Sequence, residues 1–489
     1  MRSDFLLKGL LPTQDVKKIT ERAGEASSDT IFVCVRGARA DGHDFASEAY
    51  ERGCRIFVAE HALELPSDAR ILTVPSTRQA LAHLACTLYR NPSREMRVIG
   101  ITGTKGKTTT AQLLRRILTE SGIPCGYIGT NGVLFGTVER ELTNTTPDAM
   151  TLQRTLREMQ ESGVQAVVLE VSSQALLQYR ADGICFDSVL FTNLYPDHIS
   201  PLEHPDLEHY IAAKHRLFTD FSAKHLLYSM DSPHAEEMVR GTSIPHCVSC
   251  SSQDKHADLF ADALSLWQRD GHLGISFTVH TENTSTLCEL PLLGSMQVEN
   301  ALLAIATAMT SFEIPPEQAC AALREVSVRG RSECIPLPCG ATAILDYAHN
   351  GESLRRLLSD LREYRPRRLI CLFGSVGERT QLRRSQLGEA AAELSDLCIL
   401  TADNPGREDP MRIIFEISES FLGTQTPYFA VPDREQAIRE AVRLCRRGDF
   451  LVLAGKGHES YQLIGTEKHP FCEREILLNA AEEALADPS

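Results

Sequence analysis

Short apolar runs, separated by turn-forming residues, recur along the whole chain. Near the N-terminus, runs at 31–35 and 55–59 have the length and composition of buried strands. From residue 96 onward, strand-like runs at 98–102, 166–171 and 188–192 alternate with glycine-containing loops and helical patterns. Strands that alternate with helices predict a mostly parallel sheet that is covered by helices on both faces.

The pattern changes twice further along. Residues 257–290 alternate apolar and polar side chains, which is typical of antiparallel strands, and 298–312 predict a helix. After a boundary near Gly330, apolar runs again alternate with helical patterns and predict a second α/β unit. These runs lie at 343–346, 369–373, 397–401 and 450–454.

Length and charge limit the class of protein. A chain of 489 residues predicts about three domains, which we place at 1–92, 93–330 and 331–489. The net charge of −15 argues against general binding to nucleic acid or anionic membranes. No apolar run reaches the roughly 20 residues that span a bilayer, and no signal peptide is evident. We therefore expect a cytoplasmic protein whose fifteen scattered cysteines are reduced thiols.

A loop rich in glycine, lysine and threonine joins the strand at 98–102 to a helix predicted over 108–120. It reads Gly103-Thr104-Lys105-Gly106-Lys107-Thr108-Thr109. The backbone N–H groups of such a loop bind phosphates, Lys107 can reach the β- and γ-phosphates, and Thr108 can ligate Mg²⁺. The spacing departs from Walker A, because Ile101 stands five positions before Gly106. The loop predicts a nucleoside triphosphate site without naming the reaction.

The loop resembles the phosphate loops of the Mur ligases and of the folylpolyglutamate synthases. Further motifs follow in the Mur ligase order, at 144–147, 170–176, 193–198, 213–218, 299–301, 330–331, 346–350, 403–405 and 455–459. This set covers the whole chain and resembles the MurE type, which adds the third peptide residue to UDP-N-acetylmuramoyl-L-alanyl-D-glutamate. The segment 28–45 resembles the uridine-binding domain of that type.

The resemblance implies an α/β fold of three domains. They are a UDP-binding N-terminal domain, a central ATP-binding domain with a P-loop-type, mostly parallel sheet, and a C-terminal Rossmann-like domain that binds the amino acid. The implied activity is an ATP-dependent ligation through an acyl phosphate, in the synthesis of peptidoglycan precursors. Because negative charge crowds such a site, two Mg²⁺ ions are expected. The expected partners are these small molecules only, and the expected state is a monomer.

The resemblance implies four catalytic residues. Lys107 binds the phosphates, and Glu170, which follows a buried strand, ligates Mg²⁺ together with Thr108. His198 is implied as a ligand of the second Mg²⁺. Lys214, which we expect near the start of a helix, is implied to react with CO₂ and to ligate the same ion as a carbamate. The alternatives are a solvated strand-end acid, a structural histidine and a plain surface or phosphate-binding lysine.

The resemblance also implies which residues bind the three substrates. Those for ATP are Gly103, Thr104, Lys105, Gly106, Lys107, Thr108, Thr109, Asn300, Arg331 and Asp346. Those for the UDP-muramoyl dipeptide are Ser28, Thr145, Thr146, Ser172, Gln178 and Arg180. Those on the third domain, which is implied to bind the amino acid, are His349, Arg379, Asp403, Asn404, Arg407, Gly455 and Glu459. We expect the complete site to form by domain closure.

The identity of the added amino acid depends on one loop. Relatives that add diaminopimelate read Asp-Asn-Pro-Arg, and the arginine binds the distal carboxylate bidentately. Here Gly406 takes that place and Arg407 follows it, whereas Glu459 remains available for an ammonium group. We therefore expect L-lysine or a similar diamino acid. The alternative is meso-diaminopimelate, because a shift of one residue would bring Arg407 to the same position.

Two other functions are compatible with a nucleotide site. A folylpolyglutamate synthase is disfavoured, because those relatives begin near their phosphate loop and lack the segment that precedes Asn91 here. A nucleotide-dependent binding protein with a decayed site is disfavoured, because the full set of implied catalytic residues is present. An ADP-release assay with the UDP-muramoyl dipeptide and a panel of amino acids separates these functions.

Overall fold

The computed structural model describes residues 18–486 except 38–39, 197–198, 201–202, 329 and 379–380. The chain divides into two compact units, Met1–Phe260 with Asn300–Pro315, and Ala261–Glu299 with Pro316–Ser489. All fifteen cysteines are free, as predicted. Within the described residues, no helix combines the length and the apolar character that a membrane crossing requires.

The first unit begins with a small parallel sheet of four strands in the order β1-β2-β3-β4. Their bounds are Lys18–Thr20, Thr30–Val33, Ile56–Ala59 and Arg70–Thr73, and the helices are α2 (Ala46–Glu51) and α3 (Thr77–Leu88). Side chains alternate between the two faces of a strand. Ile31 and Val33 therefore pack with α3, whereas Phe32 packs with α2.

The remainder of the first unit is built on a parallel sheet with the strand order β12-β11-β10-β5-β9-β6, which β7 and β8 extend in antiparallel fashion. The strands are β5 (Arg97–Thr102), β6 (Cys125–Gly129), β7 (Gly132–Phe135), β8 (Val138–Arg140), β9 (Ala166–Glu170), β10 (Phe186–Phe191), β11 (His225–Ser229) and β12 (His246–Ser251). The helices are α4 (Lys107–Glu120), α5 (Ala149–Glu161), α6 (Ser173–Leu177), α7 (Leu207–Thr219), α8 (Ala235–Val239) and most of α9 (Met296–Phe312). The structure thus confirms the strands predicted near 98–102, 166–171 and 188–192.

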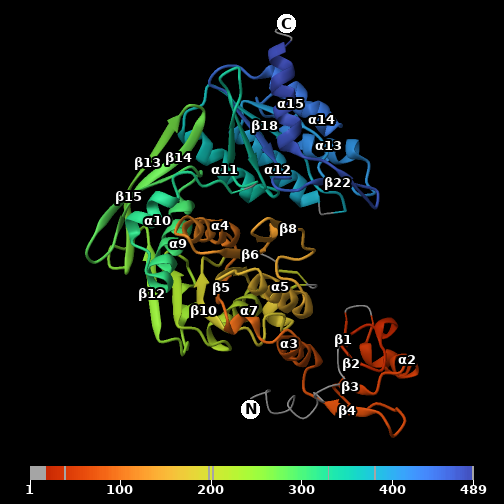
Figure 1. Cartoon of the computed structure of the whole chain (residues 1–489). Coiled ribbons are helices and arrows are strands. Elements are labelled where there is room, and N and C mark those ends of the chain that lie inside the picture. The colour runs from red at the N-terminus through yellow and green to blue at the C-terminus, as the bar shows by residue number, and fades with distance from the viewer. Residues whose placement is uncertain are drawn as a thin grey trace. The chain divides into compact units, whose positions relative to one another are not determined.

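The three central strands are neighbours, and their carboxyl ends share one edge of the sheet (Figure 1). β9 and β10 are buried along their whole length and β5 at all but its first residue, which explains their continuous apolar sequences. The phosphate loop follows β5, Glu170 is the last residue of β9, and Thr192 follows β10. Open α/β sheets bind their ligands at this edge.

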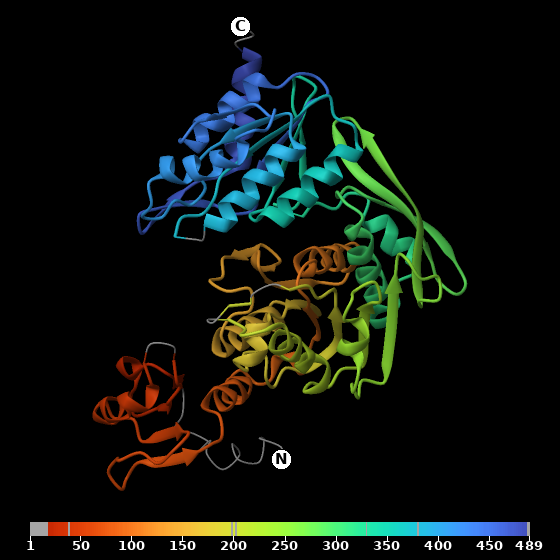
Figure 2. The same ribbon diagram turned by 180° about the vertical axis from the view of Figure 1, so that it is seen from behind.

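The second unit contains an antiparallel ribbon and a six-stranded sheet. The ribbon, green in Figure 2, consists of β13 (Leu259–Arg269), which enters the unit at Ala261, β14 (His272–His280) and β15 (Ser285–Leu290). It confirms the antiparallel strands predicted within 257–290. The sheet has the order β16-β17-β21-β18-β19-β20, in which β16 is antiparallel to its neighbour and the other pairs are parallel.

Helices cover both faces of this second sheet (Figure 1). Its strands are β16 (Glu333–Pro336), β17 (Thr342–Asp346), β18 (Leu369–Phe373), β19 (Leu397–Leu400), β20 (Tyr428–Ala430) and β21 (Phe450–Ala454). The helices are α10 (Pro316–Ala322), α11 (Gly351–Glu363), α12 (Gln381–Leu394), α13 (Pro410–Ser418), α14 (Arg434–Leu444) and α15 (Glu473–Ala486), and a hairpin of β22 (Tyr461–Ile464) and β23 (Glu467–Pro470) precedes α15. Helices α11, α12 and α13 pack on one face and α14 and α15 on the other. This is the Rossmann-like arrangement expected for the C-terminal part of the chain.

Candidate active site

The phosphate loop between β5 and α4 requires glycine at two positions. Gly103 has a φ of +151° and Gly106 one of +84°, a region that other residues rarely adopt. A Cβ at Gly103 would also collide with the Thr192 hydroxyl, and one at Gly106 with the Asn300 side chain. The loop therefore passes closely between the end of β10 and the helix α9.

The polar side chains of the loop turn toward the end of the sheet. The Lys107 ammonium donates hydrogen bonds to the carbonyl oxygens of Gly103, at 2.7 Å, and Thr104, at 3.1 Å. The Thr108 hydroxyl donates to Oε2 of Glu170 over 3.1 Å. The ammonium thus lies at the loop itself, where the phosphates of a nucleotide would bind.

Glu170 is fully buried, and both of its carboxylate oxygens accept hydrogen bonds. Oε1 accepts from the Tyr127 hydroxyl and from the N–H of Thr130 at 3.2 Å. Oε2 accepts from the hydroxyls of Thr130 and Thr108, each at 3.1 Å. Burial, and then the charge of Glu170, raises the pKa of Tyr127 well above its usual value, so that the phenol stays a donor. The carboxylate is therefore held in one orientation beside the Thr108 hydroxyl.

Lys214 lies in the middle of α7, so our prediction of a place near the helix start is wrong. The helix begins at Leu207, because the Asp206 carboxylate accepts the N–H of His209 at 2.7 Å. This bond satisfies one of the backbone donors that a helix N-terminus leaves unpaired. Lys214 is therefore carried by a helix with a well-defined beginning.

The side chain of Lys214 is directed at the phosphate loop. It is 2% exposed, and its ammonium donates to the carbonyl oxygen of Gly103 over 2.9 Å. The same nitrogen lies 4.5 Å from the centre of the Tyr210 ring, a cation–π distance. Lys107 and Lys214 thus bind the same carbonyl oxygen from two different helices.

Three residues predicted to contact the muramoyl dipeptide gather beside Glu170. The Thr146 hydroxyl donates to the Glu170 carbonyl oxygen at 2.8 Å and accepts the N–H of Ser172 at 3.0 Å. The hydroxyls of Thr145 and Thr130 lie 3.2 Å apart. These side chains form a row of hydroxyl groups at the carboxyl end of β9.

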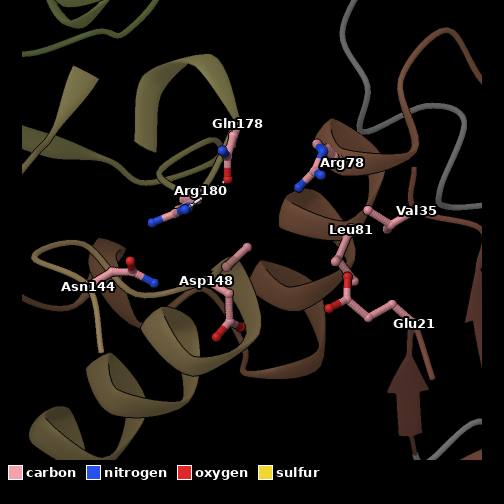
Figure 3. A pocket seen from close by; sticks show the side chains of 9 residues that line it. Glu21, Val35, Arg78, Leu81, Asn144, Asp148, Gln178 and Arg180 are labelled. Carbon is pink, nitrogen blue, oxygen red and sulfur yellow. Dashed lines mark hydrogen bonds between the residues drawn. The ribbon is translucent and has the colours of Figure 1, made fainter. Parts of the chain in front are cut away.

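Gln178 and Arg180 line a neighbouring pocket of about 130 Å³. Figure 3 shows them on one side of it, with Arg78 of α3 on the other. Arg180 donates to the carbonyl oxygen of Thr146 at 2.8 Å, which connects the pocket to the hydroxyl row. The lining of the pocket thus combines the guanidinium groups of Arg78 and Arg180 with the acidic side chains of Glu21 and Asp148. Ser28 is not among its lining residues and lies exposed in a turn before β2.

In the second unit, Asp346 is the last residue of β17. Its carboxylate accepts the N–H groups of Ser332, at 2.7 Å, and Ala348, at 2.8 Å. Burial raises the pKa of Asp346, and the nearby charge of Arg331 opposes that shift. The Arg331 guanidinium lies 5.1 Å from the centre of the Tyr347 ring. Two predicted ATP-binding residues thus lie close together at the end of this strand.

Four of the predicted amino-acid contacts meet at the ends of β19 and β21. The Lys456 ammonium donates to Oδ1 of Asn404 and to Oε2 of Glu459, each at 3.0 Å. The Asn404 amide donates to the same Glu459 oxygen at 2.8 Å. A Cβ on Gly455 would lie 2.8 Å from Oδ2 of Asp403, so this glycine lets the two loops approach. Lys456 links the cluster, and we did not predict a role for it.

Other predicted contacts stand apart from this cluster. Arg407 is exposed and makes no hydrogen bond or ion pair within the described part of the chain. Gly406 before it has a φ of +58°, and its N–H donates to the Leu463 carbonyl oxygen at 3.1 Å. The ring of His349 packs against Tyr347, with ring centres 4.7 Å apart. His198 and Arg379 lie outside the described residues. Among the described residues, no three His, Cys, Asp or Glu side chains form a metal-binding group.

A buried arginine fixes the spacing between the two loops of the cluster. Arg434, the first residue of α14, donates to the carbonyl oxygens of Ala402, at 3.2 Å, and Ala454, at 2.9 Å. It also donates to Oε1 of Glu473 over 2.7 Å, and both side chains are inaccessible to solvent. Ala402 follows β19 and Ala454 ends β21, so one guanidinium joins the two strand ends from which the cluster extends.

Replacing Arg434 by methionine should lower the free energy of unfolding by about 3–5 kcal/mol, because it leaves Glu473 buried without its cation. Burial raises the pKa of Glu473 and the charge of Arg434 opposes that rise, so the loss of Arg434 should raise this pKa further and let the folded variant hold a proton that the unfolded chain loses. The loss of stability should therefore grow as the pH rises above the usual pKa of a glutamate, in urea denaturation. Arg439→Met on the same helix, which breaks only surface pairs, should cost about 1 kcal/mol or less. An Arg434→Met loss as small as that of the control would contradict this role.

Three models of one protein family match this chain. Models described as "Mur ligase family, catalytic domain", "Mur ligase middle domain" and "Mur ligase, glutamate ligase domain" match residues 19–89, 101–308 and 330–457. A UDP-N-acetylmuramoyl-L-alanyl-D-glutamate--2,6-diaminopimelate ligase from Syntrophomonas wolfei is 38% identical over 450 residues, which are 91% of this chain and 90% of that protein. The chain belongs to the Mur ligase family.

Further similarities agree with this assignment. A ligase of the same name from Thermosynechococcus vestitus is 36% identical over 97% of this chain and 95% of its own. A solved structure with that name has a TM-score of 0.72 and 27% identity, over 97% of this chain and 96% of the other. This Mur ligase therefore has the three-domain α/β fold with a mostly parallel central sheet, and it is an ATP-dependent ligase of peptidoglycan synthesis.

Several residues of this Mur ligase site escaped prediction. Tyr127 lies on β6, Thr130 directly follows that strand, and both hold Glu170 only because β6 pairs with β9. Tyr210 stands four residues before Lys214 on α7, which places the two side chains on one helix face. Arg434 had no such signal, because its partners come from three other elements of the second unit.

Proposed function

We propose that this Mur ligase adds meso-diaminopimelate to UDP-N-acetylmuramoyl-L-alanyl-D-glutamate and converts ATP to ADP and phosphate. The observation that carries the proposal is the similarity, over nine tenths of the chain, to relatives named for this activity. A solved structure with the same name supports it at 27% identity. These relatives favour the diaminopimelate alternative over L-lysine, the residue that the glycine at position 406 led us to expect.

The reaction that we propose begins with transfer of the γ-phosphoryl group of ATP to the glutamate carboxylate. The resulting acyl phosphate is then attacked by the amine of the incoming amino acid, and phosphate leaves. Lys107 would bind the transferred group, because its ammonium already lies among the carbonyl groups of the phosphate loop. Positioning and charge stabilisation supply most of the catalysis in phosphoryl transfer.

Two Mg²⁺ ions are part of the proposal. The carboxylate of Glu170 and the hydroxyl of Thr108 are adjacent hard oxygen donors, which suits Mg²⁺. The bound ions would neutralise the phosphate charge. His198 and a carbamate on Lys214 are proposed for the second ion. The direction of the Lys214 side chain toward the phosphate loop supports this role.

The substrates are assigned to the domains as the family pattern implies. We infer that residues 1–92 bind the UDP group, that 93–330 bind ATP and the dipeptide, and that 331–489 bind the amino acid. The arginines, acids and amides that line the pocket of Figure 3 support binding of a polar substrate there. The net charge of −15 supports small-molecule partners rather than nucleic acid or anionic membranes. We infer a monomeric, cytoplasmic enzyme.

Arg407 is proposed to bind the distal carboxylate of diaminopimelate. The positive φ of Gly406 would strain an arginine at that position, so the next residue supplies the guanidinium. We expect kcat/KM to favour diaminopimelate over L-lysine and L-ornithine by about tenfold or more, or about 1.4 kcal/mol. Arg407→Ala should remove this preference, whereas Arg412→Ala, which alters an exposed pair on α13, should keep it.

ADP release with each amino acid measures both effects. A wild-type enzyme that prefers L-lysine would refute the proposed substrate. A preference for diaminopimelate that survives in Arg407→Ala would refute the role of Arg407 alone.

A further inference from the structure

Lys456 is a fully buried cation in the amino-acid part of the site. It follows β21 by two residues and is 0% exposed. Its ammonium lies 3.0 Å from Oδ1 of Asn404, 3.0 Å from Oε2 of Glu459 and 3.7 Å from Oδ1 of Asp403. A buried ammonium is costly unless it is paired and hydrogen-bonded, so these contacts account for its presence.

The cluster contains more negative than positive charge. Asp403 and Glu459 each carry a carboxylate, and Lys456 is the ammonium that both of them approach. Oδ1 of Asp403 is buried and accepts no hydrogen bond, so Lys456 supplies the charge opposite it. The neighbouring pair of Arg434 and Glu473 is balanced on its own. The three side chains around Lys456 therefore leave one negative charge for an incoming cation.

The hydrogen bonds orient Glu459 in a particular way. Oε2 accepts from both the Lys456 ammonium and the Asn404 amide, at 3.0 Å and 2.8 Å. Oε1 accepts from neither of them, and the side chain is 17% exposed. The rings of Tyr461 and Phe471 lie 5.8 Å and 5.9 Å from the ammonium. Lys456 thus fixes one oxygen of Glu459 and leaves the other available to a ligand.

We propose that Lys456 is a positioning residue for the amino-acid substrate. It turns Glu459 so that Oε1 faces the ammonium at the far end of the diamino acid, and it holds Asn404 in the same arrangement. Lys456 itself does not contact the substrate. The inference rests on the proposed function in one respect, namely that the substrate is a diamino acid. A purely structural lysine would stabilise the domain without affecting the choice of substrate.

The test compares diaminopimelate with 2-aminopimelate, which lacks the far amine. Wild-type enzyme should favour diaminopimelate in kcat/KM, because only this substrate gives Glu459 an ammonium partner. Lys456→Met keeps the length of the side chain but loses its charge. It should lower the preference at least tenfold, raise KM for diaminopimelate and change KM for ATP less than twofold. Lys468→Met is the control, because Lys468 is exposed and contacts the ring of Tyr461, 3.8 Å from its centre.

A double variant shows whether Lys456 acts through Glu459. Glu459→Gln should lower the preference to a similar extent, and Lys456→Met combined with Glu459→Gln should lower it no further. If Lys456→Met does not yield folded protein, Lys456→Gln serves in the same comparison, because its amide can replace only part of the hydrogen bonding.

The outcomes separate this inference from the proposed function. A variant that keeps the wild-type preference, or that raises KM for all three substrates in parallel, overturns the role of Lys456. Wild-type enzyme that uses L-lysine rather than diaminopimelate overturns the proposed substrate only. Lys456 is then tested in the same way with L-lysine against L-norleucine, which lacks the far amine.

Discussion

Replacing Lys107 by alanine should lower kcat by a factor of a hundred or more without unfolding the protein. The Lys107 ammonium lies within hydrogen-bonding distance of two carbonyl oxygens of the phosphate loop. When the γ-phosphoryl group is transferred, charge develops next to this preorganised cation. Removal of one such group costs roughly 3 kcal/mol or more of transition-state stabilisation. ADP release at saturating ATP, dipeptide and amino acid measures the effect.

The control for this variant lies on the same helix. Arg116 pairs with Glu120 one turn later, at 3.1 Å on the solvent side of α4, so Arg116→Ala should leave kcat unchanged. Circular dichroism and the melting temperature should be similar for both variants. If Lys107→Ala kept more than a tenth of the wild-type kcat, the assignment of the phosphate loop would have to be abandoned.

The phosphate loop could be predicted because its signals are local. An apolar run, two glycines and a helical pattern follow one another within 98–120, and each has a direct conformational meaning. The structure places β5 and α4 within one residue of the predicted bounds. Both loop glycines adopt a positive φ, which is the reason that glycine stands at these positions.

The support of Glu170 could not be predicted in the same way. Tyr127 precedes it by 43 residues and reaches it only because β6 is paired with β9. The link between Arg434 and Glu473 spans 39 residues and depends on the packing of two helices. The sequence pattern shows that such polar residues are present, but sheet order and helix packing decide which of them meet.

The prediction of L-lysine shows a second limit of prediction from the sequence. It relied on a single position, Gly406, and on the absence of an arginine from it. The structure shows that Gly406 adopts a positive φ and is hydrogen-bonded to the strand β22. The glycine at this position therefore involves the backbone of the loop and not only the loss of an arginine side chain. The similarity of the whole chain to diaminopimelate ligases outweighs one substituted position, because an exposed arginine stands next to it.

Lys214 should be required as a carbamate, so Lys214→Ala should lose about a hundredfold or more in kcat, or roughly 2.7 kcal/mol. The side chain is buried and bonded to Gly103 of the phosphate loop, close to where Lys107 binds the same oxygen. Reaction with CO₂ would replace one of these two cations by an anion, which would suit a second Mg²⁺ beside the phosphates. Short carboxylates such as acetate should partly restore Lys214→Ala, since they can supply the missing anion.

Lys214→Arg separates the carbamate from a simple cation. Arginine keeps a positive charge and can still donate to the Gly103 carbonyl oxygen, but it does not form the carbamate. We therefore expect Lys214→Arg to be as inactive as Lys214→Ala, and acetate not to restore it, because the guanidinium occupies the space. Carbon-13 NMR with labelled bicarbonate should show a carbamate signal in the wild type that both variants lack. A fully active Lys214→Arg enzyme would mean that the lysine acts as a phosphate-binding cation, and the carbamate would then have no part in holding the second metal ion.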